Sequence, residues 1–565
     1  MKRCLLTVIT TLTTVLAVLT SCAAQETPAE TQGSIFNWVS AGIDSTINPH
    51  DCAALPNYEI VDLITASLYR WVPVDGKAEL LPCLAASEPL SEDGLTWLIP
   101  INPSAKWASG EPITAEDFVY SWRMGLNPEL AYTYTAFIVE QFITVAGAMD
   151  YYLGNTGWAD VGVKAIDAYT LEIKTINAAS KTDVMRHFAH RATSPVYKAI
   201  YEKQLRAYGT EAGLFMASGP FMLTEWTKGS ERVFEKNPHY IMADMIELDG
   251  IYCRVATNEA TRIELFESGA ADCIDVGLNG LRTYAEDPRL RPYDLKTVRS
   301  IEFNRSNPKW PVLSDPLFRK AIYYATDREA LAELVSGSPA AYFISTLAIL
   351  ESGEAYRSRP EASEWLPPNY GYNPGLALEY YNEALDKYGL DSLDLTLTYS
   401  EDVPTLRAAS EFLQADWRRV LGDGFKLSLT PLPHIMAHER MRESRGAETD
   451  SWDLCWSGWT LAAETFEPQA KFAPYQSAAS NRFTDYDNAF LDESYLLFNQ
   501  EEYRNNPDLR LGLIVDTEKS VIEDATCVPV FQERAYVLFS ERVNLPDVPH
   551  TPMLGFAWEY AALGN

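Results

Sequence analysis

The sequence predicts an α/β fold, and the order of its apolar patterns carries that prediction. Short strand-like runs occur at 171–174, 393–399 and 425–429. A helical pattern, with apolar residues on one side, lies among them at 406–420. Strands that alternate with helices along a chain build α/β layers. With 565 residues, 47% of them hydrophobic, the chain is long enough for about three lobes with large cores.

Two helix starts are marked by capping residues. Thr114 can cap a helix that begins at Ala115, and Asp117, in the third helical position, can bond back to Thr114. Apolar residues then recur on one side of this helix, at Phe118, Val119, Trp122 and Met124. Asn373 followed by Pro374 marks a second start. Because no repeat or long linker follows residue 33, we expect the lobes to be interwoven.

The N-terminus has the pattern of a signal peptide. A basic start precedes an apolar, threonine-rich run that ends at Thr20, and the run is shorter than the ~20 residues of a membrane span. Residues 19–22, Leu-Thr-Ser-Cys, resemble the lipobox of bacterial lipoproteins. That resemblance implies a signal peptide over 1–21, a lipid on Cys22 and a polar tether over 22–32. A retained anchor helix, or cleavage beside an unmodified cysteine, are the alternatives.

The chain is strongly acidic. Its 46 Lys and Arg face 78 Asp and Glu, a formal net charge of −32, and removal of residues 1–21 takes away Lys2 and Arg3 and leaves −34. Nucleic acid is excluded as a partner, because its binding depends on cationic side chains that neutralise phosphates. Cationic or zwitterionic ligands are favoured, although the charge can also serve solubility alone.

Catalytic and cofactor motifs are absent from the sequence. It contains no phosphate-binding or dinucleotide-binding glycine loop, no Gly-x-Ser-x-Gly elbow and no His-Glu-x-x-His helix. His434 and His438 are the one pair that a helical turn can bring together, and a solvated or packed helix face explains them better than a metal site. We therefore predict a protein that is not an enzyme and needs no cofactor or metal.

The cysteines after Cys22 are even in number and widely spaced, at Cys52, Cys83, Cys253, Cys273, Cys455 and Cys527. Disulfides are compatible with an extracytoplasmic compartment, but the spacing specifies no connectivity. Cys253 and Cys273 lie in two nearby predicted strands and are the one pair that we single out as a candidate disulfide.

A set of motifs in this chain closely resembles the large solute-binding proteins of oligopeptide ABC importers, which are bacterial extracellular solute-binding proteins of family 5. The most specific stretches are 92–97 and 105–122, which contains Lys-Trp-Ala-Ser-Gly-Glu-Pro-Ile-Thr-Ala-Glu-Asp-Phe-Val from Lys106 to Val119. The same family order continues at 163–172, 219–223, 236–240, 264–272, 319–328, 457–459 and 528–530. The likeness covers nearly all of the chain after the signal peptide. Several of these residues have plain structural roles: Asp93-Gly94 suits a tight turn, and Trp107 and Trp122 suit a core.

The resemblance implies a periplasmic-binding-protein-like clamshell with an extra third domain. Lobe I would combine residues 33–66, 193–297 and 535–565. The additional domain II would span 67–192, and lobe III would span 298–534. The two lobes would close on a ligand, and the closed form would be read by the permease.

The resemblance also implies how a ligand is held. The family's peptide binders hold an extended peptide through its main chain, which every peptide offers in the same form. Matched to this sequence, the backbone partners would come from Ala53 and Leu55 on one edge and from Gly458 and Thr460 on the other. Trp459 would line the cleft, and Tyr132 is a weaker match to a tyrosine of domain II.

The sequence departs from the family at the position that often fixes the peptide's α-ammonium. The family has an aspartate three residues after the tryptophan, whereas this chain has Ala462. Two extra residues precede Phe466-Glu467-Pro468, so Glu464 can take the aspartate's place with a charge-assisted hydrogen bond; a solvated loop glutamate is the alternative. The family's arginine two residues before the glycine is replaced by Trp456, which puts recognition of the ligand's carboxylate end in doubt.

The expected function is therefore oligopeptide capture on the outer side of the membrane. The expected partners are the peptide, the permease and ATPase subunits of an ABC importer, and the membrane through the lipid on Cys22; we expect the chain to be a monomer. The alternatives are the same fold with another solute, such as nickel, haem, a murein peptide or an oligosaccharide, or a role as sensor or adhesin.

Overall fold

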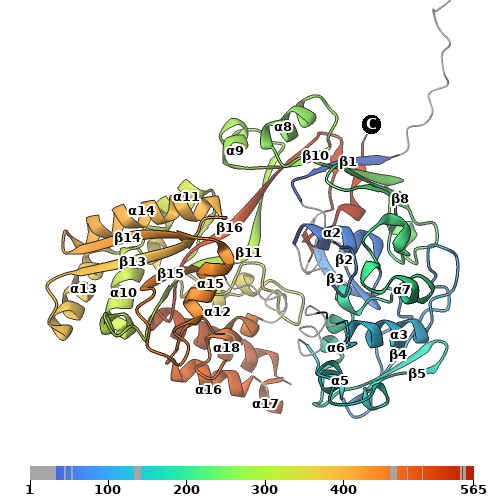
Figure 1. The fold of residues 1–565 in the computed structure, drawn as a ribbon, viewed down its shortest axis with the longest axis horizontal. Helices are drawn as coiled ribbons and strands as arrows, with labels where there is room; N and C mark the ends of the chain where they lie inside the picture. The colour runs from blue at the N-terminus through green and yellow to red at the C-terminus, as the bar shows by residue number, and fades with distance from the viewer. Residues whose placement is uncertain are drawn as a thin grey trace, which may run out of the picture.

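The computed structural model describes residues 34–42, 46–51, 55–130, 132, 142–458, 468–479, 482–498, 500–504, 506–546, 550–551 and 555–564. Within them the chain forms two bodies joined by two long strands (Figure 1). These strands are β11 (Leu290–Phe303) and β16 (Val528–Phe539), which pair antiparallel. Strands alternate with helices in both bodies, so the predicted α/β fold is confirmed. In this part of the chain no helix is both long and apolar enough to cross a membrane.

One mixed sheet runs through both bodies. Besides β11 and β16 its strands are β1 (Ile35–Ser40), β7 (Phe221–Thr227), β8 (Glu231–Lys236), β9 (Gly250–Val255), β10 (Cys273–Val276), β12 (Ser338–Pro339), β13 (Leu393–Ser400), β14 (Phe425–Leu432) and β15 (Leu454–Ser457). The order is β14-β13-β15-β11-β16-β10-β1-β9-β8-β7, and β12 pairs with β16 beside this path.

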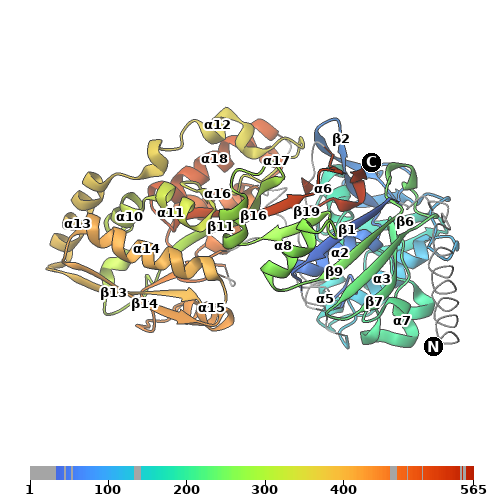
Figure 2. The ribbon, with the colours of Figure 1, turned by 90° about the horizontal axis from the view of Figure 1, so that it is seen from above.

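The ribbon formed by β11 and β16 is the crossing between the bodies, as the view from above also shows (Figure 2). β11 pairs with β15 of one body, where Ser300 faces Ser457, whereas β16 pairs with β10 of the other. The register of the ribbon is irregular between Asp294 and Val298, which lie between these two attachments.

The first body carries the N-terminal half of the chain. Two smaller sheets belong to it: β2 (Tyr69–Val74) with β3 (Lys77–Pro82), and β4 (Thr96–Pro100) with β6 (Thr170–Lys174) and β5 (Val163–Asp167). Short pairs join β17 (Val543–Asn544) to β20 (Ala562–Leu563) and β18 (His550–Thr551) to β19 (Gly555–Phe556). Its helices are α2 (Leu55–Ile64), α3 (Ala115–Gly125), α5 (Ala148–Tyr152), α6 (Lys181–His187), α7 (Lys198–Gln204), α8 (Glu259–Glu267) and α9 (Leu278–Tyr284).

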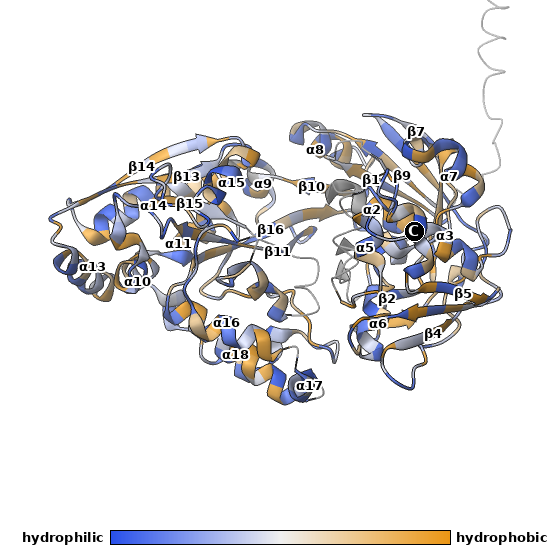
Figure 3. Cartoon of the chain, turned by 60° about the horizontal axis from the view of Figure 1, so that its bottom comes forward, coloured by the Kyte–Doolittle hydropathy of each residue, from blue (hydrophilic) through white to orange (hydrophobic). Residues whose placement is uncertain are grey.

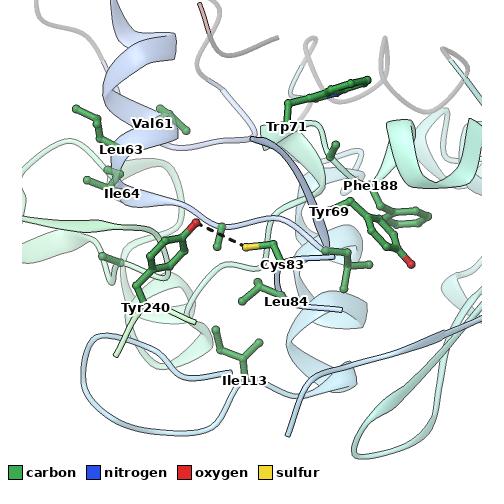
Figure 4. Close-up of a cluster of buried hydrophobic side chains, with 14 of the residues drawn as sticks. Val61, Leu63, Ile64, Tyr69, Trp71, Cys83, Leu84, Ile113, Phe188 and Tyr240 are labelled. Atoms are coloured by element: carbon green, nitrogen blue, oxygen red, sulfur yellow. Dashed lines mark hydrogen bonds between the residues drawn. The ribbon is translucent and has the colours of Figure 1, made fainter. Parts of the chain in front are cut away.

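One hydrophobic core runs through most of the first body. It joins side chains of β1 and α2 to those of β4 and α3, including Trp97, Trp107 and Trp122. Trp107 and Trp122 are 1% and 5% exposed, so their predicted place in the core is confirmed. Figure 4 shows part of this core, where Ile64, Tyr69 and Phe188 surround Cys83, whose sulfur lies 3.8 Å from the Tyr240 hydroxyl. Because the core is continuous, these elements form one packed unit.

The second body has a separate core between its sheet and its helices. The helices are α10 (Pro316–Ala325), α11 (Arg328–Val335), α12 (Pro360–Ser363), α13 (Pro374–Tyr388), α14 (Pro404–Leu421), α15 (His434–Arg442), α16 (Ala489–Leu497), α17 (Glu501–Arg504) and α18 (Pro507–Glu523). All buried side chains of this core come from residues 301–531, with Trp417 and Phe425 at 0% exposed. Figure 3 shows hydrophilic residues over much of the outer helices α13 and α17.

The elements predicted from periodicity and capping are confirmed. The strand-like runs at 171–174, 393–399 and 425–429 lie in β6, β13 and β14, and the helical run lies in α14. Asp117 accepts hydrogen bonds from the Thr114 N–H at 2.8 Å and from its hydroxyl at 2.9 Å, as the capping box predicts. The Asn373 side chain accepts the Leu376 N–H at 3.1 Å at the start of α13.

The candidate disulfide between Cys253 and Cys273 is wrong. Trp38 of β1 pairs with Cys253 of β9 on one side and with Cys273 of β10 on the other. Two strand spacings therefore separate the cysteines, roughly 9–10 Å, and a disulfide needs Cα atoms within about 7 Å. Both thiols are free and buried, and burial raises the pKa of Cys253 to about 11.

Candidate functional site

Some of the predicted site residues lie within the described part of the chain and others do not. Cys22, Ala53, Trp459, Thr460 and Glu464 lie outside them. The remaining three are Leu55, Tyr132 and Gly458. Leu55 is the first residue of α2, and Gly458 directly follows β15.

Gly458 lies against the ribbon between the bodies. It follows the pair of Ser457 with Ser300, so it stands next to Arg299 across the strands. A Cβ on Gly458 would lie 2.5 Å from Nη1 of Arg299 and 3.0 Å from the methyl carbon of Thr297. A side chain on residue 458 would have to displace the guanidinium, which occupies that space, so the fit depends on Arg299 and not on a left-handed backbone.

A buried carboxylate fixes the strand that leads to Gly458. Glu302 of β11 is 0% exposed and accepts hydrogen bonds from the hydroxyls of Ser457 at 2.8 Å and of Tyr475 and Tyr486 at 2.9 Å each. Burial raises the pKa of Glu302, and the three hydroxyl donors oppose that rise. Since β15 ends at Ser457, this network sets the position at which its backbone leaves the sheet.

Arg299 is held by the second strand of the ribbon. Its Nε and Nη2 each lie 2.7 Å from Oε1 of Glu533. The two side chains are 12% and 20% exposed, so the pair is partly shielded from water and keeps its geometry better than a surface ion pair. The guanidinium is thereby aimed at Gly458.

Helix α15 brings His434 and His438 together near Arg299, as their spacing predicts. The ring centroids are 4.4 Å apart. Burial lowers the pKa of His438 to about 4, with smaller contributions from His434, Arg442 and Arg299. The same causes, burial first and then Arg299, lower the pKa of His434. Both rings are therefore neutral at neutral pH. No group of three His, Cys, Asp or Glu able to hold a metal occurs among the described residues.

Tyr132 belongs to a buried polar network of the first body. It is 1% exposed; its hydroxyl receives a hydrogen bond from Tyr201 at 3.2 Å and one from the Asn48 amide at 3.4 Å. His50 lies beside them, with Nδ1 3.4 Å from the Tyr201 hydroxyl and Nε2 3.1 Å from that of Ser121. The network fixes residues 46–51, which lead to the predicted ligand-binding residues Ala53 and Leu55. The predicted ligand contact of Tyr132 itself stays a prediction.

Buried ion pairs hold α2 in place, and α2 begins at the predicted ligand-binding residue Leu55. Asp62 binds Arg191 through Nε at 3.0 Å and Nη2 at 2.6 Å. Arg70 donates to the Asp62 carbonyl at 2.9 Å and pairs with Glu559 at 2.5 Å. Such pairs fix an orientation more than they add stability. Nothing in the local sequence pattern signals them, because the partners are 129 and 489 residues apart.

This chain belongs to the bacterial extracellular solute-binding proteins of family 5, whose middle region matches residues 79–483. The dipeptide-binding protein of Lactococcus lactis subsp. cremoris (strain MG1363) is 27% identical over 474 residues, which cover 80% of each chain. The predicted family is therefore confirmed. It is a family of solute-binding proteins and not of enzymes.

Solved structures agree with this assignment at the level of the fold. Listeria monocytogenes OppA bound to peptide has a TM-score of 0.68 at 20% identity and covers 95% of this chain and 100% of its own. The Escherichia coli murein tripeptide binding protein MppA has a TM-score of 0.70 at 19% identity and covers 94% of this chain and 99% of its own. The fold is thus periplasmic-binding-protein-like, as predicted.

Proposed function

We propose that this protein captures oligopeptides between its two bodies and delivers them to the permease of an ABC importer. The observation that carries the proposal is the position of Ser457 and Gly458, where β15 ends beside the ribbon that joins the bodies. Support also comes from the family and from the relative named as a dipeptide-binding protein.

The bound peptide would lie extended and pair through its main chain. Gly458 and Thr460 would supply backbone partners from the second body, and Ala53 and Leu55 from the first. Trp459 would line the cleft, with Tyr132 a further contact. Main-chain pairing accepts many sequences, because amides and carbonyls recur in every peptide.

The ligand would hold the two bodies together and so stabilise the closed form, which the permease reads. The proposed lobe boundaries, with lobe III at 298–534, suit this motion. The bounds of lobe III are supported by the buried cores, since one lies wholly within 301–531 and another draws on residues on both sides of that range.

The experiment that tests the function is native mass spectrometry of the chain from Ala23 onward, purified without denaturation so that carried-over ligand stays bound. We expect a spread of added masses that fragment as short peptides. A single added mass that does not fragment as a peptide would show that the ligand is one specialised solute and not a range of peptides. An empty protein that also fails to take up added peptides would contradict the proposal.

Glu464 is proposed to hold the peptide's α-ammonium in place of the family aspartate. Glu464→Ala should then weaken binding of a free peptide about tenfold or more, the scale of one charge-assisted hydrogen bond. It should leave the binding of an N-acetylated peptide unchanged. Glu467→Ala, three residues on, is the control. Equal affinity of wild type and Glu464→Ala for the free peptide would show that the assignment is wrong.

We further propose that a lipid on Cys22 anchors the protein on the outer side of the membrane. A radiolabelled fatty acid fed to the expressing cells should label the wild-type chain and not Cys22→Ser. Equal labelling of both chains would contradict the anchor.

A further inference from the structure

A segment of the second body leaves its core, turns and returns, and we call this segment, residues 342–357, the strap. Its two arms are held together by backbone hydrogen bonds, from the Tyr356 N–H to the Ala348 carbonyl and from the Leu350 N–H to the Glu354 carbonyl, each at 2.8 Å. Residues 350–354 are therefore a closed turn at the tip of the strap.

Both ends of the strap are bound to one buried carboxylate of the second body. Glu518 of α18 is 0% exposed. It accepts the N–H groups of Phe343 and Ile344 at 2.9 and 2.8 Å. From the other end of the strap it accepts the Tyr356 hydroxyl at 2.9 Å and pairs with Arg357. A charged acceptor makes strong hydrogen bonds, so the base of the strap moves with the second body.

The strap is also bound to the ribbon that joins the bodies. The Thr346 hydroxyl donates to Asp294 at 2.9 Å, and the Thr346 N–H donates to Oε1 of Gln532 at 3.1 Å. Nε2 of Gln532 in turn donates to the Leu295 carbonyl at 2.7 Å. Asp294 and Leu295 begin the part of the ribbon whose register is irregular. A break in register lets a strand pair bend, so the strap is attached where the ribbon can bend.

The tip of the strap meets the first body. Nη2 of Arg186, at the end of α6, donates to the Leu350 carbonyl at 3.4 Å. Arg186 is 0% exposed, and a buried guanidinium is costly unless acceptors surround it. On the same turn, a Cβ on Gly353 would lie 3.8 Å from the carbonyl oxygen of Ala78 in β3. The tip therefore lies against both α6 and β3.

The tip is held from the side of the second body as well. Arg510 of α18 donates to Glu351 at 2.6 Å, and Glu351 directly follows the residue whose carbonyl Arg186 contacts. Close by, α17 and α6 lie opposite each other in both Figure 1 and Figure 2, and Arg504 of α17 donates to the Ala178 carbonyl. These contacts with the first body all fall within 67–192, the range proposed as domain II.

We propose that the strap is a latch, which holds the two bodies at the separation that the structure shows by seating its tip on domain II. Only four residue steps separate Thr346 on the ribbon from Leu350 at the tip, a reach of at most ~14 Å. The strap therefore has little slack, and bending of the ribbon releases the tip. The inference goes beyond solute capture, since it gives domain II a role in setting the resting arrangement of the bodies.

The test is double electron-electron resonance between spin labels on Glu247→Cys in the first body and Glu443→Cys in the second, two exposed positions. The chain from Ala23 onward carries Cys52→Ser, and its remaining native cysteines are buried, so the labels react with the new thiols. Native mass spectrometry shows that the sample is free of ligand. Wild type should give one narrow distance peak.

Two variants release the latch from opposite sides. Arg186→Met removes the donor and should raise the share of molecules outside the peak about tenfold, the scale of one hydrogen bond to a charged group. Arg510→Met loosens the tip without altering the first body and should shift the share in the same direction. If Arg186→Met fails to fold, Arg510→Met carries the test.

Arg206→Met is the matched control. Arg206 also donates to a backbone carbonyl, that of Leu130 at 2.6 Å, but within the first body. This variant should keep the wild-type peak.

An unchanged narrow peak in Arg510→Met and in folded Arg186→Met would overturn the latch. A wild-type distribution as broad as those of the variants, or equal broadening in Arg206→Met, would also overturn it. Because these samples contain no ligand, the result is independent of the proposed function: failure of the latch leaves peptide capture standing, and failure of peptide binding leaves the latch standing.

Discussion

Three imidazoles of the first body are buried so deeply that they stay neutral in the fold. Burial lowers the pKa of His50 and of His187 to about 3 each, and it lowers that of His190 well below its ordinary value. In the unfolded chain each ring takes up a proton near pH 6.5. Between about pH 6.5 and 3 the unfolded state therefore binds more protons, so stability falls as the pH is lowered.

His187 is the simplest of the three to test, since its ring packs between Trp122 at 5.6 Å and Phe188 at 5.2 Å. His187→Phe keeps a ring and removes the titration. As the pH falls from 7 to 5, wild type should lose about 2 kcal/mol of unfolding free energy that His187→Phe keeps. The loss follows from ~1.4 kcal/mol per pH unit below the unfolded pKa of about 6.5. Urea unfolding at each pH measures this, with the partly exposed His239→Phe as control. Parallel curves for wild type and His187→Phe would contradict the account.

At the scale of elements, Gly219 holds the end of α2 against the start of β7, the strand that follows Gly219. Its N–H donates to the Ile64 carbonyl at 3.0 Å, and its own carbonyl accepts from the Asn237 amide at 2.9 Å. A Cβ on Gly219 would lie 2.5 Å from the Thr65 nitrogen, which belongs to the backbone and cannot turn aside. This close approach positions α2, and with it the start of the helix at Leu55.

Gly219→Ala should therefore push β7 away from α2. We expect a loss of about 1–3 kcal/mol in the free energy of unfolding, as for other overpacked sites. Gly213→Ala is the matched control, because it lies six residues earlier and a Cβ there meets no atom within 4 Å. Chemical unfolding of both variants measures the difference. Equal stability of the two would show that the contact between α2 and β7 tolerates a shift.

The elements that the sequence predicted correctly are those that local chemistry decides. Strand alternation marked β6, β13 and β14, and capping residues marked α3 and α13. The disulfide prediction failed because two strands that follow each other in sequence, β9 and β10, are separated in the sheet by β1. The pairing of Arg299 with Glu533 could not be predicted for the same kind of reason, because Glu533 lies 234 residues away and only the fold brings it close.

The site residues were predicted from the resemblance and not from local pattern. Gly458 could be placed in advance because it sits in a motif, but the reason for glycine there, the guanidinium of Arg299, depends on the pairing of β11 with β15. No spacing rule in a single sequence contains that pairing.

At the scale of the whole molecule, two side-chain hydrogen bonds between described residues join the bodies outside the ribbon. Arg186 of α6 donates to the Leu350 carbonyl at 3.4 Å, and Arg504 of α17 donates to the Ala178 carbonyl. Each body has its own core, so a movement of one body against the other leaves both cores intact. Relative movement of the bodies about the ribbon is therefore the motion that the fold permits most readily.

Small-angle X-ray scattering of the chain from Ala23 onward, with and without a saturating peptide found by native mass spectrometry, tests the central claim most directly. Peptide binding between the bodies predicts a smaller radius of gyration and a narrower distribution of interatomic distances in the bound sample. If the peptide saturates the protein and both scattering curves coincide, the peptide does not draw the two bodies together, and the account of capture by closure is contradicted.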